Sequence, residues 1–324
     1  MRHRPARAAW VTGGVVLVVA LVALVAWRMP EVAAWQWYAS AGKPAMTTVE
    51  PRLAPPLHWF DDYYAVADLG EGAYAIAEPR YAQCNFSYLI VGARRALLFD
   101  SGPGLHDIRA VVSKLTALPV LAMPSHLHFD HVGNLARFHD VALPDLPSLR
   151  GQAPGGRLDL GFYQYLGFVE GFSRPHVVVS DWVAPGAEVD LGGRQLTMLS
   201  VPGHTPESVA LLDRKGNRLF AGDFIYPSSI FAFLPGANLQ DYRRSARQVM
   251  QVLDDASMVY GGHGCDALPA VDVPAMRRAD VVALERSLAI AVANRWRIGG
   301  EWYPRVFPVN ERMKLLAKYP WMRP

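Results

Sequence analysis

Short apolar runs, separated by residues that favour turns, recur along most of the chain. Three of the intervening turns are marked by glycine, at Gly92-Ala93-Arg94, Gly192-Gly193 and Lys215-Gly216-Asn217. Apolar runs of this length bounded by turn residues are typical of buried strands. The pattern predicts strands over residues 73–77, 86–91, 95–99, 120–123, 188–191, 194–201, 208–212, 218–221 and 258–260.

Longer stretches show the spacing of an amphipathic helix. Residues 106–118 place Ile108, Val111, Val112 and Leu115 on one face, and helices are also predicted over 239–253 and 273–296, with a short helix-like stretch over 134–139. Two strand-rich halves with helices between them predict a mixed α/β fold in which helices pack on sheets.

The densest group of metal-binding residue types follows the predicted strand 120–123. In Ser125-His126-Leu127-His128-Phe129-Asp130-His131, three imidazoles and one carboxylate stand within positions 126–131. These side chains suit Zn²⁺ and similar cations. A lone histidine is usually explained by ordinary packing, but four such groups are not, because buried polar groups cost free energy unless they are paired.

Three more candidate ligands each end an apolar run and each follow a glycine. They are His204 after Gly203, Asp223 after Gly222 and His263 after Gly262. Glycine lets the backbone turn tightly and leaves room beside the chain. The repeated form predicts that these side chains converge with the 126–131 cluster.

The complete set resembles the ligand set of the metallo-β-lactamase superfamily, and the resemblance extends over about residues 69–264. It implies a four-layer αββα sandwich and two metals. The implied ligands are His126, His128 and His204 for the first metal, Asp130, His131 and His263 for the second, and Asp223 between them. Asp100 would orient the ligand loop through hydrogen bonds rather than bind metal.

The resemblance also implies a chemistry. Two zinc ions, with iron or manganese as alternatives, would hold a bridging hydroxide that attacks a carbonyl carbon. Asp130 and Tyr226 are the candidate catalytic side chains. Tyr226 stands three positions after Asp223, which is similar to the Asp-x-x-Tyr pairing of the acyl-homoserine lactonase branch; simple packing is the alternative for this tyrosine. The chain has no Gly-x-Ser-x-Gly segment that would indicate a serine nucleophile.

The expected reaction is hydrolysis of an ester, lactone or thioester, in the style of the lactonase, glyoxalase II and acyl-CoA thioesterase branches. A β-lactam is an alternative substrate. A protein of the same fold that binds metal without catalysis, or for redox chemistry, is the alternative from another class. Apolar side chains in 158–172 and 230–234 could wall a pocket for a lipophilic acyl group.

The N-terminus predicts a membrane anchor. Residues 8–27 have no charge, and about twenty apolar residues cross the roughly 30 Å core of a bilayer. Arg2, Arg4 and Arg7 precede this run, which favours a cytoplasmic N-terminus and an exported domain. A cleaved signal sequence, giving a secreted protein, is the alternative. The predicted parts are an anchor over 1–28, a linker over 29–57, a metallo-β-lactamase domain over 58–272, and a helix with an aromatic tail over 273–324.

Composition adds limits on the partners. The 324 residues have a net charge of +3 and no basic stripe interleaved with aromatics. A small-molecule substrate is therefore expected, and nucleic acid is not; the oligomeric state does not follow from the sequence. The chain has two cysteines, Cys84 and Cys265, for which one disulfide and two free thiols are both open.

Overall fold

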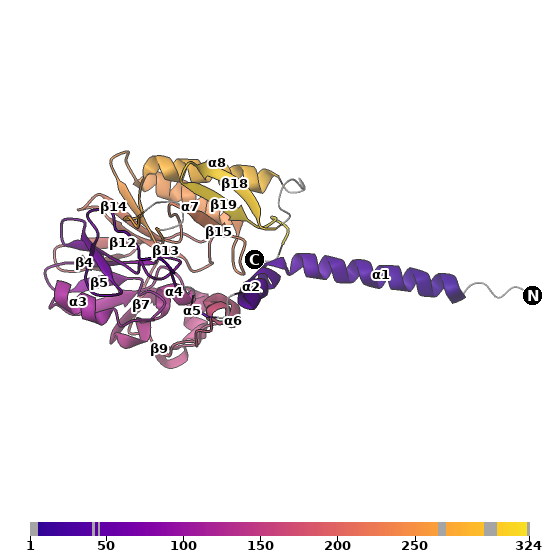
Figure 1. Cartoon of the computed structure of the whole chain (residues 1–324), viewed down its shortest axis with the longest axis horizontal. Coiled ribbons are helices and arrows are strands. Elements are labelled where there is room, and N and C mark those ends of the chain that lie inside the picture. Colours follow the sequence, from indigo (N-terminus) through magenta and orange to yellow (C-terminus); the bar gives the residue numbers. More distant parts are fainter. Residues whose placement is uncertain (1–5, 41–42, 45, 265–269, 295–302, 323–324) are drawn as a thin grey trace, which may run out of the picture.

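Two β-sheets packed face to face form the centre of the molecule, and helices cover their outer faces (Figure 1). The computed structural model describes residues 6–40, 43–44, 46–264, 270–294 and 303–322. Within these residues the order of layers is helix, sheet, sheet, helix. This is the mixed α/β architecture that the strand pattern predicts, with the four layers that the resemblance implied.

The first sheet has eight strands in the described residues, in the order β1-β2-β3-β4-β5-β6-β7-β10. Its first five strands pair antiparallel, and β5, β6, β7 and β10 pair parallel. The bounds are β1 His58–Trp59, β2 Ala65–Asp68, β3 Ala73–Ala77, β4 Phe86–Val91, β5 Ala96–Phe99, β6 Val120–Met123, β7 Asp140–Pro144 and β10 Asp181–Val183.

The second sheet has six strands in the same described ranges, in the order β11-β12-β13-β14-β16-β17. Its pairs are antiparallel except for β14 and β16, which run parallel. The bounds are β11 Glu188–Asp190, β12 Gln195–Ser200, β13 Val209–Asp213, β14 Arg218–Gly222, β16 Met258–Gly261 and β17 Ala275–Arg277.

The core lies in three apolar layers. Side chains such as Phe99, Met198 and Phe220 fill the space between the two sheets. Helices α7 (Leu239–Val252) and α8 (Arg278–Ala293) cover the outer face of the second sheet, and α3 (Arg109–Leu115) covers that of the first. The parallel pairs β5–β6 and β14–β16 leave their carboxyl ends at shared edges, which is where α/β sheets usually bind ligands.

An insert between β7 and β10 is built from short elements beside the ligand loop. Its bounds are α5 Pro147–Gln152, η2 Pro154–Gly156, β8 Arg157–Leu158, α6 Phe162–Tyr165, η3 Gly167–Glu170 and β9 Val177–Val178, with β8 pairing β9. Leu166, between α6 and η3, has a φ of 57°. A leucine rarely adopts this left-handed conformation, so the surrounding packing must hold it there.

The C-terminal segment returns to the metal-bearing half of the molecule. Strands β18 (Arg305–Asn310) and β19 (Met313–Ala317) form a hairpin, and β19 pairs parallel with β15 (Ser229–Ala232), which follows Asp223. The sequence leaves open whether this tail packs on the domain or touches membrane; its described residues form a third, small sheet with β15.

Two helices stand at the N-terminus. Helix α1 (Ala6–Trp27) projects away from the domain, and α2 (Met29–Ser40) turns back onto it (Figure 1). In the described residues, no single helix meets the length and hydropathy needed to cross a bilayer; Val15–Trp27 and Met29–Gln36 meet them only as a pair bent by 69°. The anchor over 1–28 thus stays a prediction.

Several predicted elements differ from the structure. The predicted helix 273–296 is strand β17 followed by α8, and its last residues, 295–296, lie outside the described residues. The helix-like stretch 134–139 is a single 3₁₀ turn, η1 (Leu135–Arg137), because Phe138 already has extended backbone. The segment 29–57 contains helix α2 where a linker is predicted. Cys84 is disulfide-bonded; Cys265 lies outside the described residues.

Candidate metal centre

The 126–131 cluster lies on the loop and short helix that follow β6. His128 has extended backbone, and α4 (Phe129–Val132) then turns Asp130 and His131 inward. All four polar side chains of the cluster are at least 95 % buried. Asp223 follows β14 directly, His263 lies two residues beyond β16, and His204 lies in the loop after β12. The two sheets therefore deliver the seven predicted ligands to one edge.

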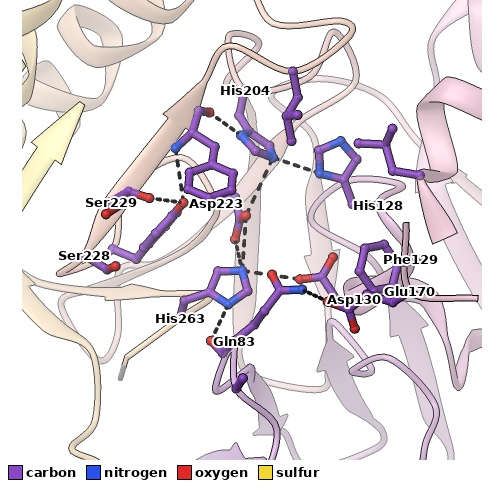
Figure 2. A pocket seen from close by; sticks show the side chains of 15 residues that line it. Gln83, His128, Phe129, Asp130, Glu170, His204, Asp223, Ser228, Ser229 and His263 are labelled. Carbon is purple, nitrogen blue, oxygen red and sulfur yellow. Dashed lines mark hydrogen bonds and ion pairs between the residues drawn. The ribbon is translucent and has the colours of Figure 1, made fainter. Parts of the chain in front are cut away.

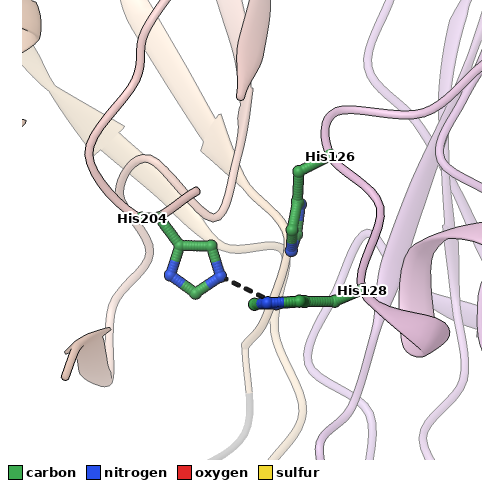
Figure 3. Close-up of side chains that lie close together, drawn as sticks. All are labelled: His126, His128 and His204. Carbon is green, nitrogen blue, oxygen red and sulfur yellow. Dashed lines mark hydrogen bonds between the residues drawn. The ribbon is translucent and has the colours of Figure 1, made fainter. Parts of the chain in front are cut away.

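Ligand atoms of the seven residues form three overlapping groups. Each group has its atoms within 4.8 Å of one another: His126, His128 and His204; His126, His131 and Asp223; Asp130, His131 and His263. Figure 3 shows the first group, with the Nε2 atom of His204 lying 3.0 Å from Nδ1 of His128. The first and third groups are the two ligand sets that the resemblance implied.

Asp223 lies between the two sets. One of its oxygens, Oδ2, is 3.6 Å from Nε2 of His204, and the other, Oδ1, is 3.3 Å from Nε2 of His131 and 3.2 Å from Nε2 of His263. The carboxylate therefore faces both groups, as a bridging ligand must.

Glycine makes this closeness sterically feasible. A Cβ atom on Gly262 would lie 2.5 Å from Oδ1 of Asp223, and one on Gly222, whose φ is 48°, would lie 2.3 Å from the side chain of Ser125. Neither position has room for a side chain.

Two of the five imidazole rings are each held by a hydrogen bond to a backbone carbonyl on the side away from the cluster. His204 donates from Nδ1 to the carbonyl oxygen of Phe231 at 2.7 Å, and His263 donates from Nδ1 to that of Gln83 at 2.9 Å (Figure 2). These bonds select the tautomer whose Nε2 atom has a free lone pair, which is the form that binds a metal.

Asp100 lies behind the ligand loop at the end of β5. Its Oδ1 atom accepts a hydrogen bond from the backbone N–H of Ser125 at 2.6 Å, and its Oδ2 atom lies 3.0 Å from Nδ1 of His131. The carboxylate thus orients both the loop and one ring. It belongs to none of the three ligand groups.

Asp130 is held by an amide that the sequence analysis did not single out. Asn85 donates from Nδ2 to the backbone oxygen of Asp130 at 2.8 Å and to its Oδ2 atom at 3.1 Å. Both residues are buried. The same Oδ2 atom also lies 3.3 Å from Nε2 of His131 and 3.4 Å from Nε2 of His263, so Asn85 fixes the carboxylate beside both rings.

The pKa values of three ligands suit cation binding, whereas His131 must first release a proton. Burial lowers the pKa of His126 well below its ordinary value and that of His128 to about 3, so both imidazoles are neutral at pH 7. Burial raises the pKa of Asp223, but the charges of His263 and His131 outweigh it and hold the pKa well below the usual range. Burial alone would lower the pKa of His131, yet Asp130, Asp223 and Asp100 raise it well above normal.

The donor set fits divalent cations. Nε2 of His126, Nε2 of His131 and Oδ1 of Asp223 are buried without a hydrogen-bond partner. Leaving buried polar atoms unpaired costs free energy, which a cation coordinated by them would recover. Imidazole and carboxylate ligands favour zinc, iron or manganese over calcium.

A cavity opens directly onto these ligands (Figure 2). Its apolar wall comes from Phe129, Leu166, Phe231 and Leu234. The predicted segment 158–172 contributes Leu166 and Glu170 to the cavity, and its aromatic rings pack elsewhere. The predicted segment 230–234 contributes Phe231 and Leu234. Its other apolar side chains, Ile230 and Phe233, are buried and do not line the cavity.

Tyr226 lines the same cavity, but its hydroxyl is engaged with the backbone. It donates to the carbonyl of Ser229 at 2.8 Å and accepts from the N–H of Phe231 at 3.2 Å. Its ring lies 5.0 Å from that of His263. Donation to a substrate would require the phenol to leave the Ser229 carbonyl.

Sequence reasoning missed four residues that shape the site. Gln83 holds His263 and donates from Nε2 to Glu170 at 3.1 Å, and Ser228 and Ser229 border the cavity. These residues act through backbone atoms or through partners distant in sequence, so no local motif marks them. Asn85 had a weaker signal, because it directly precedes the predicted strand 86–91.

The fold and the ligand geometry agree with a family-wide comparison. The model of the metallo-beta-lactamase superfamily matches residues 85–263, more than half of the chain. The chain belongs to the metallo-beta-lactamase superfamily. The match begins at Asn85 and ends at His263, so it encloses all seven candidate ligands.

Individual members of the superfamily are also similar. The acyl-coenzyme A thioesterase MBLAC2 of Gallus gallus is 30% identical over 224 residues, covering 60% of this chain and 77% of that protein. The probable metallo-hydrolase YqgX of Bacillus subtilis is 24% identical over 188 residues, covering 58% and 86%. A metallo-beta-lactamase from Pontibacter korlensis superimposes with a TM-score of 0.53 at 16% identity, covering 70% of this chain and 99% of that one; this likeness shows the superfamily fold alone.

Proposed function

We propose that this protein is a dinuclear zinc hydrolase that cleaves acyl thioesters. The observation that supports the proposal most strongly is the convergence of seven imidazole and carboxylate ligands, in two sets joined by Asp223, at the floor of a partly apolar cavity. The similarity to an acyl-coenzyme A thioesterase over 224 residues supports a thioester as the substrate.

The residues of the chain have distinct tasks in this proposal. When bound, a pair of divalent cations would polarise a carbonyl and lower the pKa of water. The carboxylate of Asp130, held by Asn85, is placed to take a proton from the attacking water and to return it to the thiolate that leaves. One water is consumed, the C–S bond breaks, and a carboxylic acid and a thiol are released.

The cavity explains a preference for acyl groups. Phe129, Leu166, Phe231 and Leu234 offer apolar surface beside the ligands, and a hydrocarbon chain placed against them loses contact with water. Lipophilic acyl thioesters should therefore bind better than short ones.

A metal analysis and a substrate panel test the proposal. Purified full-length protein should contain two equivalents of zinc and should hydrolyse acyl thioesters faster than lactones, simple esters, phosphodiesters or β-lactams. A chelator should abolish the activity and zinc should restore it. A preparation that binds zinc but hydrolyses none of the panel would instead support a metal-binding protein without catalysis, and preferential β-lactam cleavage would reassign the substrate.

A pair of histidine variants provides the control. His126→Ala should lose most of the activity and part of the zinc. His139→Ala, which alters an imidazole that is 98% exposed, should change neither. Full activity in His126→Ala would overturn the assignment of the ligand loop.

We also propose that the N-terminal helices attach the domain to a membrane, with the domain on the exported side. The uncharged run of α1 and the three arginines before it support this location. Fractionation of cells expressing the full chain, with protease applied from the exported side, should find the domain in the membrane fraction and accessible. A domain released in soluble form by signal cleavage would contradict the anchor.

A further inference from the structure

Exposed aromatic side chains gather around helix α2. Of the tryptophan and phenylalanine residues whose burial the structure describes, four are exposed: Trp27, Trp35, Phe162 and Trp321, with exposed fractions of 43%, 46%, 44% and 38%. They come from α1, α2, the insert and the C-terminal segment. We call these four residues the aromatic belt.

Direct contacts join the belt to α2. The ring of Trp35 lies 6.0 Å from that of Phe162 and 4.8 Å from that of Phe168, and its Nε1 atom donates to the hydroxyl of Tyr163 at 3.1 Å. On the other side of α2, Met29 packs in a buried cluster with Tyr319, on which Trp321 stacks at 5.5 Å. Figure 1 shows α2 between α6 and the C-terminus.

The exposed side chains of helix α1 indicate which medium surrounds the aromatic belt. From residue 15 to residue 25, consecutive side chains on all sides of this helix are exposed and apolar, including Val16, Leu17, Val18 and Val19. A helix that is apolar all round needs an apolar medium all round, which a bilayer supplies and a single protein surface does not. Helix α1 meets the criteria for a bilayer span only together with Met29–Gln36, so its apolar side chains support immersion in the bilayer rather than a complete span.

The bend between the helices places α2 along the surface of that bilayer. Val15–Trp27 and Met29–Gln36 meet at 69°. With α1 close to the membrane normal, α2 lies nearly in the plane of the interface, where tryptophan is enriched. Arg28, at the bend, pairs with Glu31 at 3.4 Å and keeps 44% of its side chain exposed.

Buried apolar side chains connect helix α2 with the cavity beside the metal ligands. Ala34 of α2 is fully buried in one apolar cluster with Phe129, Leu166 and Leu234, and these three side chains also line the cavity. Apolar contacts therefore run without interruption from α2 to the wall beside the metal ligands.

We propose that the aromatic belt lies in the headgroup region of a phospholipid bilayer, and that the enzyme takes long-chain acyl thioesters from the membrane rather than from water. The choice of substrate rests on the proposed function. The placement of the belt does not, and it is tested separately.

Lipid contact is measured with the full-length protein in vesicles of phosphatidylcholine and phosphatidylglycerol. Phosphatidylcholine brominated near the headgroup quenches tryptophans at the interface. Trp35→Phe and Trp321→Phe should each remove emission that these lipids quench. Trp59→Phe, on the edge strand β1 and packed against the core between the two sheets, should remove emission that they do not quench. If the lipids quench the emission of Trp35, Trp321 and Trp59 equally, or quench none of it, the belt does not lie in the headgroup region.

Substrate uptake is measured with two thioesters of one thiol, a hexadecanoyl thioester in the vesicles and a butanoyl thioester in water. Phe162→Ser combined with Trp321→Ser should lower kcat/KM for the first by about tenfold, or about 1.4 kcal/mol, and leave the second unchanged. Val178→Ser combined with Ile290→Ser alters two exposed apolar side chains outside the belt and should change neither.

The remaining outcomes are distinguishable. Equal loss on both substrates would show that the belt supports the fold and would overturn the proposal. A concentration-dependent dimer that Phe162→Ser and Trp321→Ser abolish would assign the belt to a second copy of the chain and would also overturn it. If the unaltered protein cleaves neither thioester, the proposed function fails, while quenching still decides where the belt lies.

Discussion

Phe231 connects Tyr226 to His204. Its backbone N–H donates to the hydroxyl of Tyr226 at 3.2 Å, and its carbonyl accepts from Nδ1 of His204 at 2.7 Å. Because the same hydroxyl donates to the carbonyl of Ser229, Tyr226 holds strand β15 at two points. The tyrosine therefore supports a metal ligand from behind.

We expect Tyr226→Phe to weaken zinc binding by about tenfold, in the range found for groups that orient ligand histidines. Chelator competition measures the affinity, and excess zinc should restore kcat. Tyr74→Phe, on strand β3, is the matched control. A lower kcat at saturating zinc with unchanged affinity would favour instead the donor role that the Asp-x-x-Tyr resemblance predicts.

Asp100→Asn should also lower zinc affinity, by about 10- to 100-fold. The amide keeps the size of the side chain but loses its negative charge. It also has one acceptor oxygen instead of two, so it cannot accept from both the N–H of Ser125 and Nδ1 of His131. Zinc content after dialysis and affinity by competition are the measurements. Asp68→Asn alters an exposed carboxylate at the end of strand β2 and should leave both unchanged; equal values for the two variants would refute the role of Asp100.

The buried pair Arg194–Asp213 should contribute to stability rather than to catalysis. The guanidinium lies 2.5 Å from the carboxylate and also donates to the backbone carbonyls of Glu71 and Val91, which connects the two sheets. Asp213→Asn leaves a buried charge unpaired, so the free energy of unfolding should fall by about 3–5 kcal/mol.

Urea denaturation measures that loss. The exposed pair Arg94–Asp190 supplies the comparison, since Asp190→Asn should cost no more than about 1 kcal/mol. Similar losses in the two variants would show that burial does not govern this interaction.

The raised pKa of Glu78 predicts that the stability of the fold depends on pH. Burial raises its pKa from 4.5 to about 8, although the hydrogen bond that Tyr63 donates at 2.6 Å opposes the shift. The folded state thus keeps a proton that the unfolded state releases above pH 4.5. The stabilisation is complete below that pH and declines as the pH rises to about 8.

Glu78→Gln should remove this decline. The difference in unfolding free energy between the unaltered protein and the variant should change by up to about 1.4 kcal/mol per pH unit across the window. Urea denaturation at a series of pH values, with chelator present, provides the data. Parallel pH profiles for the two proteins would show that Glu78 is ionised in the fold.

Local sequence predicts much of the central sandwich. The bounds of β3, β4 and β6 agree with the predicted runs, because each run is apolar on both faces and ends at turn residues or at the polar ligand loop. The convergence of the seven candidate ligands could be predicted for the same reason, since each follows a recognisable strand end.

Other parts depend on contacts between distant residues. The segment 29–57 resembles a linker by composition, yet Trp35 and Ala34 pack on the insert and make α2 part of the domain. Strand β15 forms only by pairing with β19, far along the chain, so its own residues give a weak strand signal. Gln83 acts through a backbone carbonyl, which any residue possesses, so its identity could not indicate its role.

The parallel pairing of Ile230 with Leu315 has a consequence for the newly made protein. The wall that presents Phe231 to His204 is secured by β19, which is synthesised after all seven candidate ligands. A chain that ends between His263 and β19 would hold all seven candidate ligands yet lack the strand that pairs with β15.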